Sequence, residues 1–244
     1  MDRRREPLPT RVGDLPLLPT EYDRVLGVGL ASLGLELDAS AREAIAGHVR
    51  LLLAWNRAIN LTAIVHPERV ATLHVIDSLT AVPLVAARRG VPRLVDIGSG
   101  GGFPGLPLAI AVPEAEVVLV ESIGKKARFL DAAVAALGLE PRVQVAGVRA
   151  ETLAAEVRDE RLAPFDVVTA RAIGSLPDLV RLAFPLLVPG GRLVAWKRGD
   201  LTAEIKAAER AATAFGGSRI TERRTTAAGL ESHILIVIER VRRD

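Results

Sequence analysis

The stretch Leu94-Val95-Asp96-Ile97-Gly98-Ser99-Gly100-Gly101-Gly102-Phe103-Pro104-Gly105 indicates the architecture of this 244-residue chain. A run of mostly apolar residues ends at closely spaced glycines, and a helix-like stretch begins at Leu106. This order is typical of a strand, a tight turn and a helix start, with which open α/β sheets bind nucleotide-like ligands. Glycine at the turn permits positive φ and a close approach of the backbone to a ligand.

The spacing of the glycines separates two classes of ligand. A dinucleotide-binding fingerprint has glycine at the first, third and sixth positions, and counted from Gly98 the sixth position is Phe103. Instead, Asp96 precedes the loop, and a second apolar run, 117–120, ends at Glu121. A carboxylate there suits the two ribose hydroxyls of an adenosine, so the pattern favours S-adenosylmethionine and a methyltransferase. The alternative is a glycine-rich turn that binds no ligand.

Composition narrows the classes of function. The 49% hydrophobic and 25% charged residues are ordinary for a globular protein, and the net charge of +3 permits nucleic-acid binding without requiring it. The absence of cysteine excludes disulfides, thiolate metal sites and methyl transfer through a cysteine adduct. The four histidines lack the spacing of metal ligands. No apolar stretch approaches the ~18 residues of a membrane span, and the basic N-terminal segment is not followed by the apolar core of a signal peptide. We therefore expect a cytoplasmic protein, a monomer, with no metal and no membrane segment.

Three regions are expected along the chain. Residues 1–19 predict a mobile leader, 20–85 an N-terminal helical extension, and 86–244 an S-adenosylmethionine-dependent methyltransferase domain. Within the extension, helices are expected from Thr20, over 40–59 with Ser40 and Glu43 as a capping box, and over 67–79.

After Pro92, strands and helices alternate. Strands are predicted at 93–97, 116–120, 142–146, 165–170, 191–196, 218–225 and 232–239, and helices between them at 105–111, 124–137, 151–160, 177–187 and 201–214. Strand–helix units imply right-handed crossovers and a parallel sheet, and the last two strands, joined around Gly229, must pair antiparallel. The expected fold is α/β: a Rossmann-like class I methyltransferase sheet, mainly parallel and ending in an antiparallel hairpin.

Several motifs occur in a fixed order. They are Trp55-Asn56 followed by Asn60-Leu61-Thr62, His74-Val75-Ile76-Asp77-Ser78, Asp96 to Pro107, Glu121 to Leu130, Arg149-Ala150-Glu151, Ala170-Arg171-Ala172 and Lys197. In this order the set resembles the bacterial ribosomal RNA small subunit methyltransferase G family, also called glucose-inhibited division protein B. The resemblance covers roughly residues 45 to 240, and the H-x-x-D-S element and the Gly-Phe-Pro-Gly-Leu-Pro run are its specific parts.

The resemblance implies an enzyme that moves the methyl group of S-adenosylmethionine to N7 of one guanine in 16S ribosomal RNA, free or in the small ribosomal subunit. By position, the implied cofactor residues are Gly98, Phe103, Ala150 and Glu151, with Arg171 between cofactor and RNA, and Arg149 and Lys197 facing RNA. The residues themselves add Asp96, Gly100 and Glu121 to the cofactor site and Lys125 to the RNA contacts. Before the histidine of the last strand the family often has a basic residue, where this chain has Ser232-His233. That departure puts an RNA contact there in doubt, and Arg223 and Arg224 are the candidates to compensate.

The expected chemistry assigns no catalytic base. Guanine N7 carries an in-plane lone pair and no proton, so the rate comes mainly from alignment, worth ~7–11 kcal/mol in effective-molarity terms. Arg171 and Lys197 are expected to position the substrate. The alternatives are transfer to a ribose 2′-hydroxyl, with Lys197 helping deprotonation, a small-molecule methyltransferase of the same fold, and a non-catalytic RNA-binding or ribosome-assembly factor.

Some of these residues also have purely structural interpretations. His74 and Asp77 lie three apart on one helical face and are expected to form a buried polar pair that docks the N-terminal helices, with RNA contact as the alternative. Arg171 fits a salt bridge as well as a ligand contact, and Trp196 is expected in the core. Lys125, Lys126 and Arg128 open a helix whose dipole disfavours cations, so they are either phosphate contacts or part of a solvated face.

Overall fold

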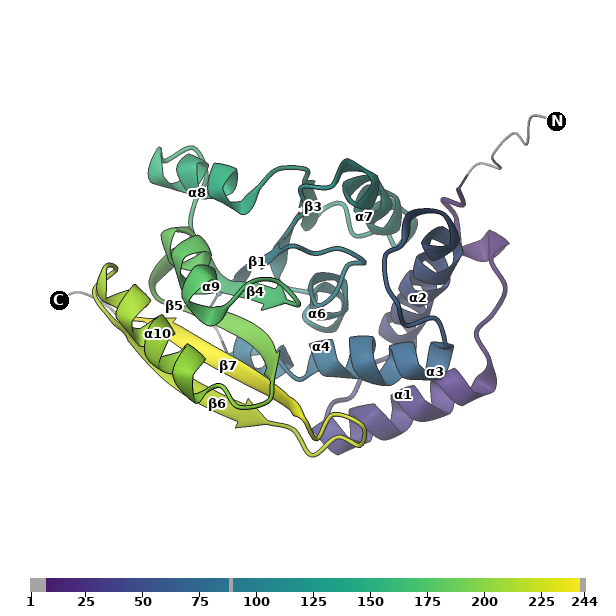
Figure 1. Cartoon of the computed structure of the whole chain (residues 1–244). Coiled ribbons are helices and arrows are strands. Elements are labelled where there is room, and N and C mark those ends of the chain that lie inside the picture. The colour runs from purple at the N-terminus through teal and green to yellow at the C-terminus, as the bar shows by residue number, and fades with distance from the viewer. Residues whose placement is uncertain (1–7, 88–89, 242–244) are drawn as a thin grey trace.

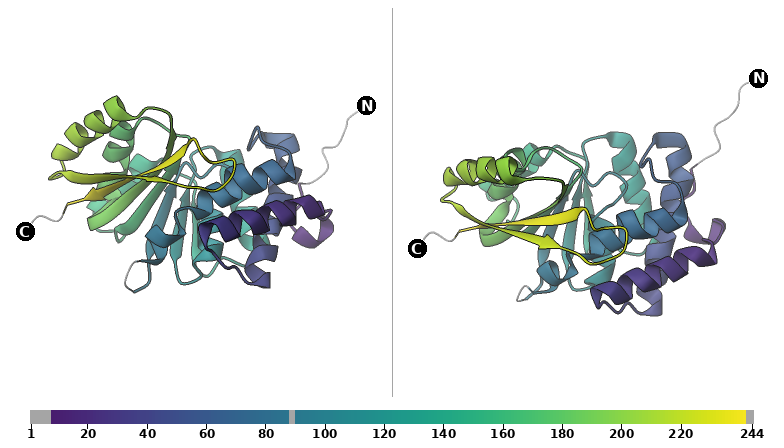
Figure 2. Two further views of the ribbon diagram at one scale, coloured as in Figure 1. Left: turned by 90° about the horizontal axis from the view of Figure 1, so that it is seen from below. Right: turned by 60° about the horizontal axis from the view of Figure 1, so that its bottom comes forward.

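The protein is a seven-stranded sheet covered by helices on both faces (Figures 1 and 2). The computed structural model describes residues 8–87 and 90–241. The strand order is β3-β2-β1-β4-β5-β7-β6. The strands are β1 (Arg93–Ile97), β2 (Glu116–Val120), β3 (Val143–Ala146), β4 (Phe165–Arg171), β5 (Leu187–Arg198), β6 (Ser218–Arg224) and β7 (His233–Arg240).

Two hydrophobic clusters hold the helices to the sheet. The helices are α1 (Thr20–Leu33), α2 (Ala39–Ile59), α3 (Pro67–Val70), α4 (Asp77–Leu79), α5 (Val82–Ala86), α6 (Gly105–Ala111), α7 (Gly124–Ala136), α8 (Ala150–Arg158), α9 (Leu176–Ala183) and α10 (Thr202–Thr213), with shorter turns η1 (Val12–Asp14), the π-helical η2 (Ala71–Ile76) and η3 (Phe184–Leu186). One cluster joins α1 to α7 to one face of the sheet, and the other joins α8, α9 and α10 to the opposite face. The N-terminal helices therefore share a core with the sheet.

The predicted sheet is confirmed. Strands β1 to β5 pair in parallel, and β7 pairs antiparallel with both β5 and β6. β5 begins earlier than expected, at Leu187, because a register irregularity between Phe165 and Val167 of β4 accommodates the extra residues. The helix expected over 177–187 is shorter: α9 ends at Ala183, since Pro185 supplies no backbone donor and a 3₁₀ turn follows.

The order of the strands fixes the place of a binding site. β1 lies between β2 and β4, so the crossovers leave β1 in opposite directions. In open α/β sheets ligands bind outside the carboxyl ends of the strands at such a switch point. The glycine loop after Ile97 lies at this point.

Part of the segment expected as a leader makes hydrogen bonds to α2. Residues 1–7 of the expected leader lie outside the described residues, but Pro9 accepts a hydrogen bond from Trp55 Nε1, 2.7 Å. Arg50 of α2 donates to the carbonyls of Val12 and Leu15. The cap expected for α2 was also wrong: Asp38, not Ser40, accepts from the backbone of the first turn, because the helix begins one residue before Ser40.

The segment Pro67–Ala86 is long and apolar enough in composition to cross a membrane. Of its most apolar window, 61% is buried inside the protein. The buried core helix of a globular protein passes the same test, and this segment carries the His74 and Asp77 side chains discussed below. The helix begins with Pro67 at its first position, as predicted.

Candidate functional site

The glycine loop after β1 needs glycine for two reasons. Gly98, Gly100 and Gly102 have φ of 72°, 55° and 85°. A Cβ on Gly98 would also lie 3.0 Å from Ile173, and one on Gly102 would lie 2.5 Å from Leu106. Glycine therefore allows the loop to fold tightly against Ile173 and Leu106.

Glu121, at the end of β2, is tied directly to this loop. Its Oε2 accepts from the Gly100 amide at 3.0 Å and its Oε1 from the Ile123 amide at 2.8 Å. The residue is only 6% exposed, so these bonds fix the orientation of the carboxylate. A carboxylate has about four acceptor sites, and each oxygen here keeps capacity for a ligand hydroxyl. Glu121 and Gly100, two predicted cofactor residues, therefore lie together.

Asp96 lies beneath the loop and is fully buried. Its carboxylate accepts from Thr169 Oγ1 at 2.8 Å and from the Gly105 amide at 3.2 Å. Burial raises the pKa of Asp96 to about 6, against the lowering effect of these hydrogen bonds. In this arrangement Asp96 connects β1 to β4 and to the start of α6, and acts on a ligand by holding the loop.

Arg171, at the tip of β4, is enclosed by the helix that carries the H-x-x-D-S element. Its guanidinium donates to Asp77 Oδ2 at 3.2 Å, to the Leu73 carbonyl at 3.0 Å and to His74 Nδ1 at 3.0 Å. Burial, and then the charge of Arg171, lower the pKa of His74 to about 3, which leaves its imidazole neutral and able to accept. His74 and Asp77 thus dock this helix against β4 by sharing Arg171.

The rings of His74 and Phe103 connect Arg171 to the glycine loop. The guanidinium carbon of Arg171 lies 5.4 Å from the Phe103 ring centroid, and the His74 ring stacks on Phe103 at 4.8 Å. Phe103 also meets the ring of His48, with ring centroids 4.5 Å apart. The two predicted residues Phe103 and Arg171 are therefore neighbours.

His48 is a site residue that the sequence analysis did not identify. Its Nε2 lies 2.8 Å from the Gly101 carbonyl, 53 positions away, and burial lowers the pKa of the ring to about 4. The neutral ring donates to the loop and fixes it against α2. A lone histidine on an amphipathic helix carries no spacing signal, so the sequence contained no hint of this contact.

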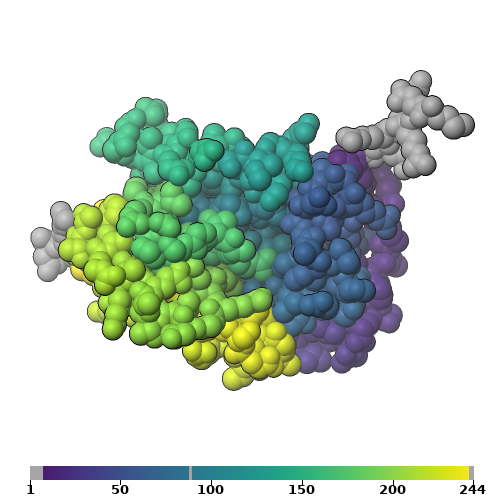
Figure 3. All heavy atoms as spheres, viewed as in Figure 1, coloured from purple at the N-terminus to yellow at the C-terminus, as the bar shows by residue number. Residues whose placement is uncertain are grey.

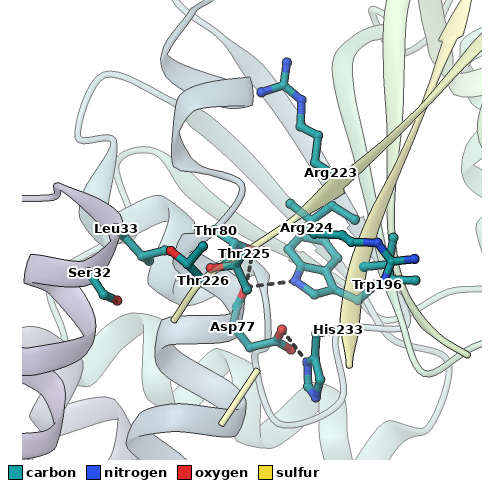
Figure 4. Close-up of a pocket in the computed structure, with 12 residues that line it drawn as sticks. Ser32, Leu33, Asp77, Thr80, Trp196, Arg223, Arg224, Thr225, Thr226 and His233 are labelled. Atoms are coloured by element: carbon teal, nitrogen blue, oxygen red, sulfur yellow. Dashed lines mark hydrogen bonds and ion pairs between the residues drawn. The ribbon is translucent and has the colours of Figure 1, made fainter. Parts of the chain in front are cut away.

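Asp77 also joins the last strand to the same network (Figure 4). Its Oδ1 lies 2.7 Å from His233 Nδ1, and its backbone carbonyl accepts from Trp196 Nε1 at 2.8 Å. Trp196 is buried, as expected. One carboxylate therefore contacts groups from both β4 and β7.

The predicted RNA-facing residues have different environments. Lys125, in the first turn of α7, is exposed and lines a cavity of about 650 Å³ together with Arg57 and Arg128. Arg149 is exposed at the N-terminus of α8. Lys197, whose side chain is 15% exposed, donates to Glu204 at 2.7 Å and to the Gly174 carbonyl at 2.8 Å.

The last two predicted cofactor residues, Ala150 and Glu151, open α8, which follows β3. The end of β3 is bonded to the end of β2, where the Glu121 amide donates to the Ala146 carbonyl at 3.1 Å. Ala150 and Glu151 therefore begin the helix after the strand next to Glu121, and Glu151 is exposed.

Comparisons with known proteins agree with this geometry. Solved structures with the same fold include an O-methyltransferase from Bacillus cereus in complex with SAH (TM-score 0.56, 18% identity, 86% of this chain and 94% of that chain) and cofactor-bound Rv0187 from MTB (TM-score 0.52, 21% identity, 84% and 92%). Among curated proteins, the ribosomal RNA small subunit methyltransferase G of Geobacter sp. (strain M21) is 41% identical over 217 residues, 88% of this chain and 96% of the relative. The one from Sorangium cellulosum is 44% identical over 193 residues, 79% and 77%. The family described as rRNA small subunit methyltransferase G matches residues 41–230, and the chain belongs to this family.

Proposed function

We propose that this protein transfers the methyl group of S-adenosylmethionine to N7 of a guanine in 16S ribosomal RNA. The observation that carries the proposal is the Glu121 carboxylate, fixed by two backbone amides beside a positive-φ glycine loop at the switch point of the sheet. Family membership supplies the class of reaction and the RNA substrate.

The residues present fit S-adenosylmethionine. A Cβ on Gly100 would meet nothing closer than the Gly98 carbonyl at 3.7 Å, so the backbone at Gly100 has space beside a carboxylate that retains acceptor capacity. The residues that would hold the nucleoside are Gly98, Gly100, Phe103, Glu121, Ala150, Glu151 and Arg171, with Asp96 acting through the loop. When bound, the cofactor supplies an electrophilic methyl group on a sulfonium sulfur.

The protein's part in the reaction is alignment. Guanine N7 attacks with a lone pair that carries no proton, so no side chain has to accept one. Holding the two reactants in line and excluding water is worth ~7–11 kcal/mol. The histidines beside Phe103 are committed elsewhere, since His48 bonds the Gly101 carbonyl and His74 contacts Arg171 and Thr62. Both are neutral core contacts, which agrees with a reaction that needs no base.

The ion pair of Lys197 favours N7 over a ribose 2′-hydroxyl. A general base must reach the proton that it takes, whereas the Lys197 Nζ already contacts Glu204 at 2.7 Å and the Gly174 carbonyl at 2.8 Å. The same ion pair makes Lys197 a positioning group for the segment after β4. Its contact with RNA and that of Arg171 stay predictions.

The exposed cations support RNA as the substrate over a small molecule. Lys125, Arg128 and Arg57 line one cavity, and the sequence analysis did not identify Arg57 as a phosphate contact. We infer that these side chains and Arg149 contact phosphates of the small-subunit RNA, in the cytoplasm, with the protein acting as a monomer. Binding should then weaken steeply with salt.

The test is methyl transfer from labelled S-adenosylmethionine to small ribosomal subunits and to 16S RNA from a strain that lacks this enzyme. We expect about one methyl per RNA, with chain cleavage at one guanine after the treatment that opens 7-methylguanine. Methylation of a ribose would support the 2′-hydroxyl alternative. Equal activity on unrelated RNA would remove the claim of specificity, and no transfer to any RNA would leave only a small-molecule enzyme or a binding factor.

A further inference from the structure

Glu204, in the first turn of α10, joins α9, β5 and α10 at the carboxyl edge of the sheet. Its Oε1 accepts from the Leu176 amide at 2.6 Å and from Lys197 Nζ at 2.7 Å. Leu176 is the first residue of α9, and Lys197 lies near the end of β5. Figure 3 shows α9, in green, and α10, in yellow-green, side by side on one face of the molecule. One carboxylate oxygen therefore connects three neighbouring elements.

The β4–α9 turn, residues 172–175, has an unusual backbone. Ala172 has φ of 58°, in the left-handed region that a residue with a Cβ rarely adopts. Such a conformation persists where the surrounding structure holds it, and it occurs most often at functional sites. Two contacts hold this turn, since the Gly174 carbonyl accepts from Lys197 Nζ at 2.8 Å and Glu204 binds the amide that follows the turn. Lys197 and Glu204 therefore fix the β4–α9 turn from the side of β5 and α10.

The β4–α9 turn also contacts the glycine loop. A Cβ on Gly98 would lie 3.0 Å from Cγ2 of Ile173, so the Ile173 side chain lies directly against Gly98. Arg171, whose guanidinium carbon lies 5.4 Å from the Phe103 ring centroid, immediately precedes the turn. The position of the β4–α9 turn therefore sets the positions of two side chains beside the proposed cofactor site.

The environment of the ion pair between Lys197 and Glu204 helps it to keep its geometry. Their side chains are 15% and 26% exposed, so the pair is screened less than one on an open surface. Hydrogen bonds between charged groups are about twice as strong as neutral ones. Glu204 also lies in the first turn of α10, where the helix dipole favours an anion. The bonds to Glu204 and to the Gly174 carbonyl use two of the three N–H donors of Lys197, so one donor stays free for a substrate group.

We propose that Glu204 is a positioning residue of the methyl-transfer reaction, which holds Lys197 and the β4–α9 turn in place without touching the substrate. This rests on the proposed function, because it takes transfer to RNA by alignment as the reaction. In such a reaction a misplacement of ~1 Å can cost about 100-fold in rate. The glycine loop keeps its own hydrogen bonds to Asp96 and His48. Loss of Glu204 should therefore lower the rate of transfer more than the affinity for S-adenosylmethionine.

The test compares loss of the acceptor with loss of the charge alone. E204A leaves the Leu176 amide and Lys197 without this acceptor, whereas the amide oxygen of E204Q can accept from both. With small subunits from a strain that lacks the enzyme, E204A should lower kcat about thirtyfold and change KM for S-adenosylmethionine by less than about threefold. E204Q should restore kcat to within about fivefold of wild type, because it keeps the hydrogen bonds and loses only their charge. E209A, which removes an equal charge from the exposed side of the same helix, is the control and should match wild type.

Calorimetry with S-adenosylmethionine, run on each variant, separates a displaced turn from a misfolded protein. Retained binding with a reduced kcat in E204A, and rescue by E204Q, would support the proposal. A lower Tm of E204A with kcat unchanged would make Glu204 a purely structural residue and overturn it. Loss of S-adenosylmethionine binding in E204A, or an equal fall of kcat in E204A and E204Q, would also overturn it. Methylation of RNA by the wild type distinguishes these failures from failure of the proposed function, in which the wild type would be inactive on RNA as well.

Discussion

Removing the Asp77 carboxylate tests the contacts that join the N-terminal helices to the sheet. The side chain is 4% exposed and contacts Arg171, itself 14% exposed, and His233. In Asp77→Ala the buried guanidinium loses its carboxylate, and breaking such a pair costs about 3–5 kcal/mol. Each kcal/mol lowers Tm by ~2–4 °C in a chain of this size. We therefore expect a fall in Tm of about 10 °C.

Urea unfolding followed by circular dichroism measures the loss, and a double-mutant cycle assigns it to the pair. Because Asp77→Ala/Arg171→Ala removes both charges, its loss should be smaller than the sum of the single losses by about 2 kcal/mol. The exposed Arg24–Glu21 pair of α1 is the control, and Glu21→Ala should barely change the midpoint. A loss below about 1 kcal/mol for Asp77→Ala, or additive single losses, would refute the reasoning.

Three further predictions concern the glycine loop. Glu121→Gln turns an amide donor toward the Gly100 or Ile123 amide, which are donors themselves. Calorimetry should show an affinity for S-adenosylmethionine at least about tenfold lower, with the far-ultraviolet circular dichroism spectrum unchanged. An unchanged affinity would show that Glu121 does not contact the cofactor. Burial raises the pKa of Asp96 to about 6, above its unfolded value of 3.8, so the native state binds the extra proton and gains stability as pH falls from 7 to 5. Urea unfolding of wild type and Asp96→Asn is measured at both pH values, so that the contribution of the histidines, which is common to both proteins, drops out. The difference in unfolding free energy between the two proteins should shift by about 1 kcal/mol in favour of wild type at pH 5. A shift of opposite sign would contradict a buried carboxyl whose pKa is raised. Gly98→Ala and Gly199→Ala both place a Cβ at positive φ, but only the first meets Ile173 at the loop. Both variants should therefore lose stability, while only Gly98→Ala should lose affinity for the cofactor. Equal cofactor affinities of the two variants would contradict a role of the loop in binding.

The sheet was predictable from sequence because its signals are local. Most strands are short apolar runs, and a glycine or proline directly flanks most of them, so the seven strands could be placed from local spacing. The antiparallel hairpin followed from a connection too short for a crossover. Where local signals compete, prediction failed: Asp38 precedes Ser40 by two residues, and both are good caps.

The site was only partly predictable because its contacts join distant residues. Asp77 and His233 are separated by 156 positions, and His48 and Gly101 by 53, with no periodicity linking either pair. The motif order named Arg171 and Asp77, and Arg171 also fitted a salt bridge, but nothing in the sequence identified Asp77 as its partner. No sequence signal linked Lys197 to its partner Glu204, because a lysine near the end of a strand has the same local pattern whether its side chain contacts RNA or a carboxylate.

The central claim is that one S-adenosylmethionine binds at the carboxyl ends of β1 and β2, with its ribose on Glu121. Isothermal titration of the folded protein with S-adenosylmethionine, and in parallel with reduced nicotinamide adenine dinucleotide, tests it most directly. We predict one site for the methyl donor, weakened in Glu121→Gln, and no measurable heat for the dinucleotide. Binding of the dinucleotide alone would contradict the account.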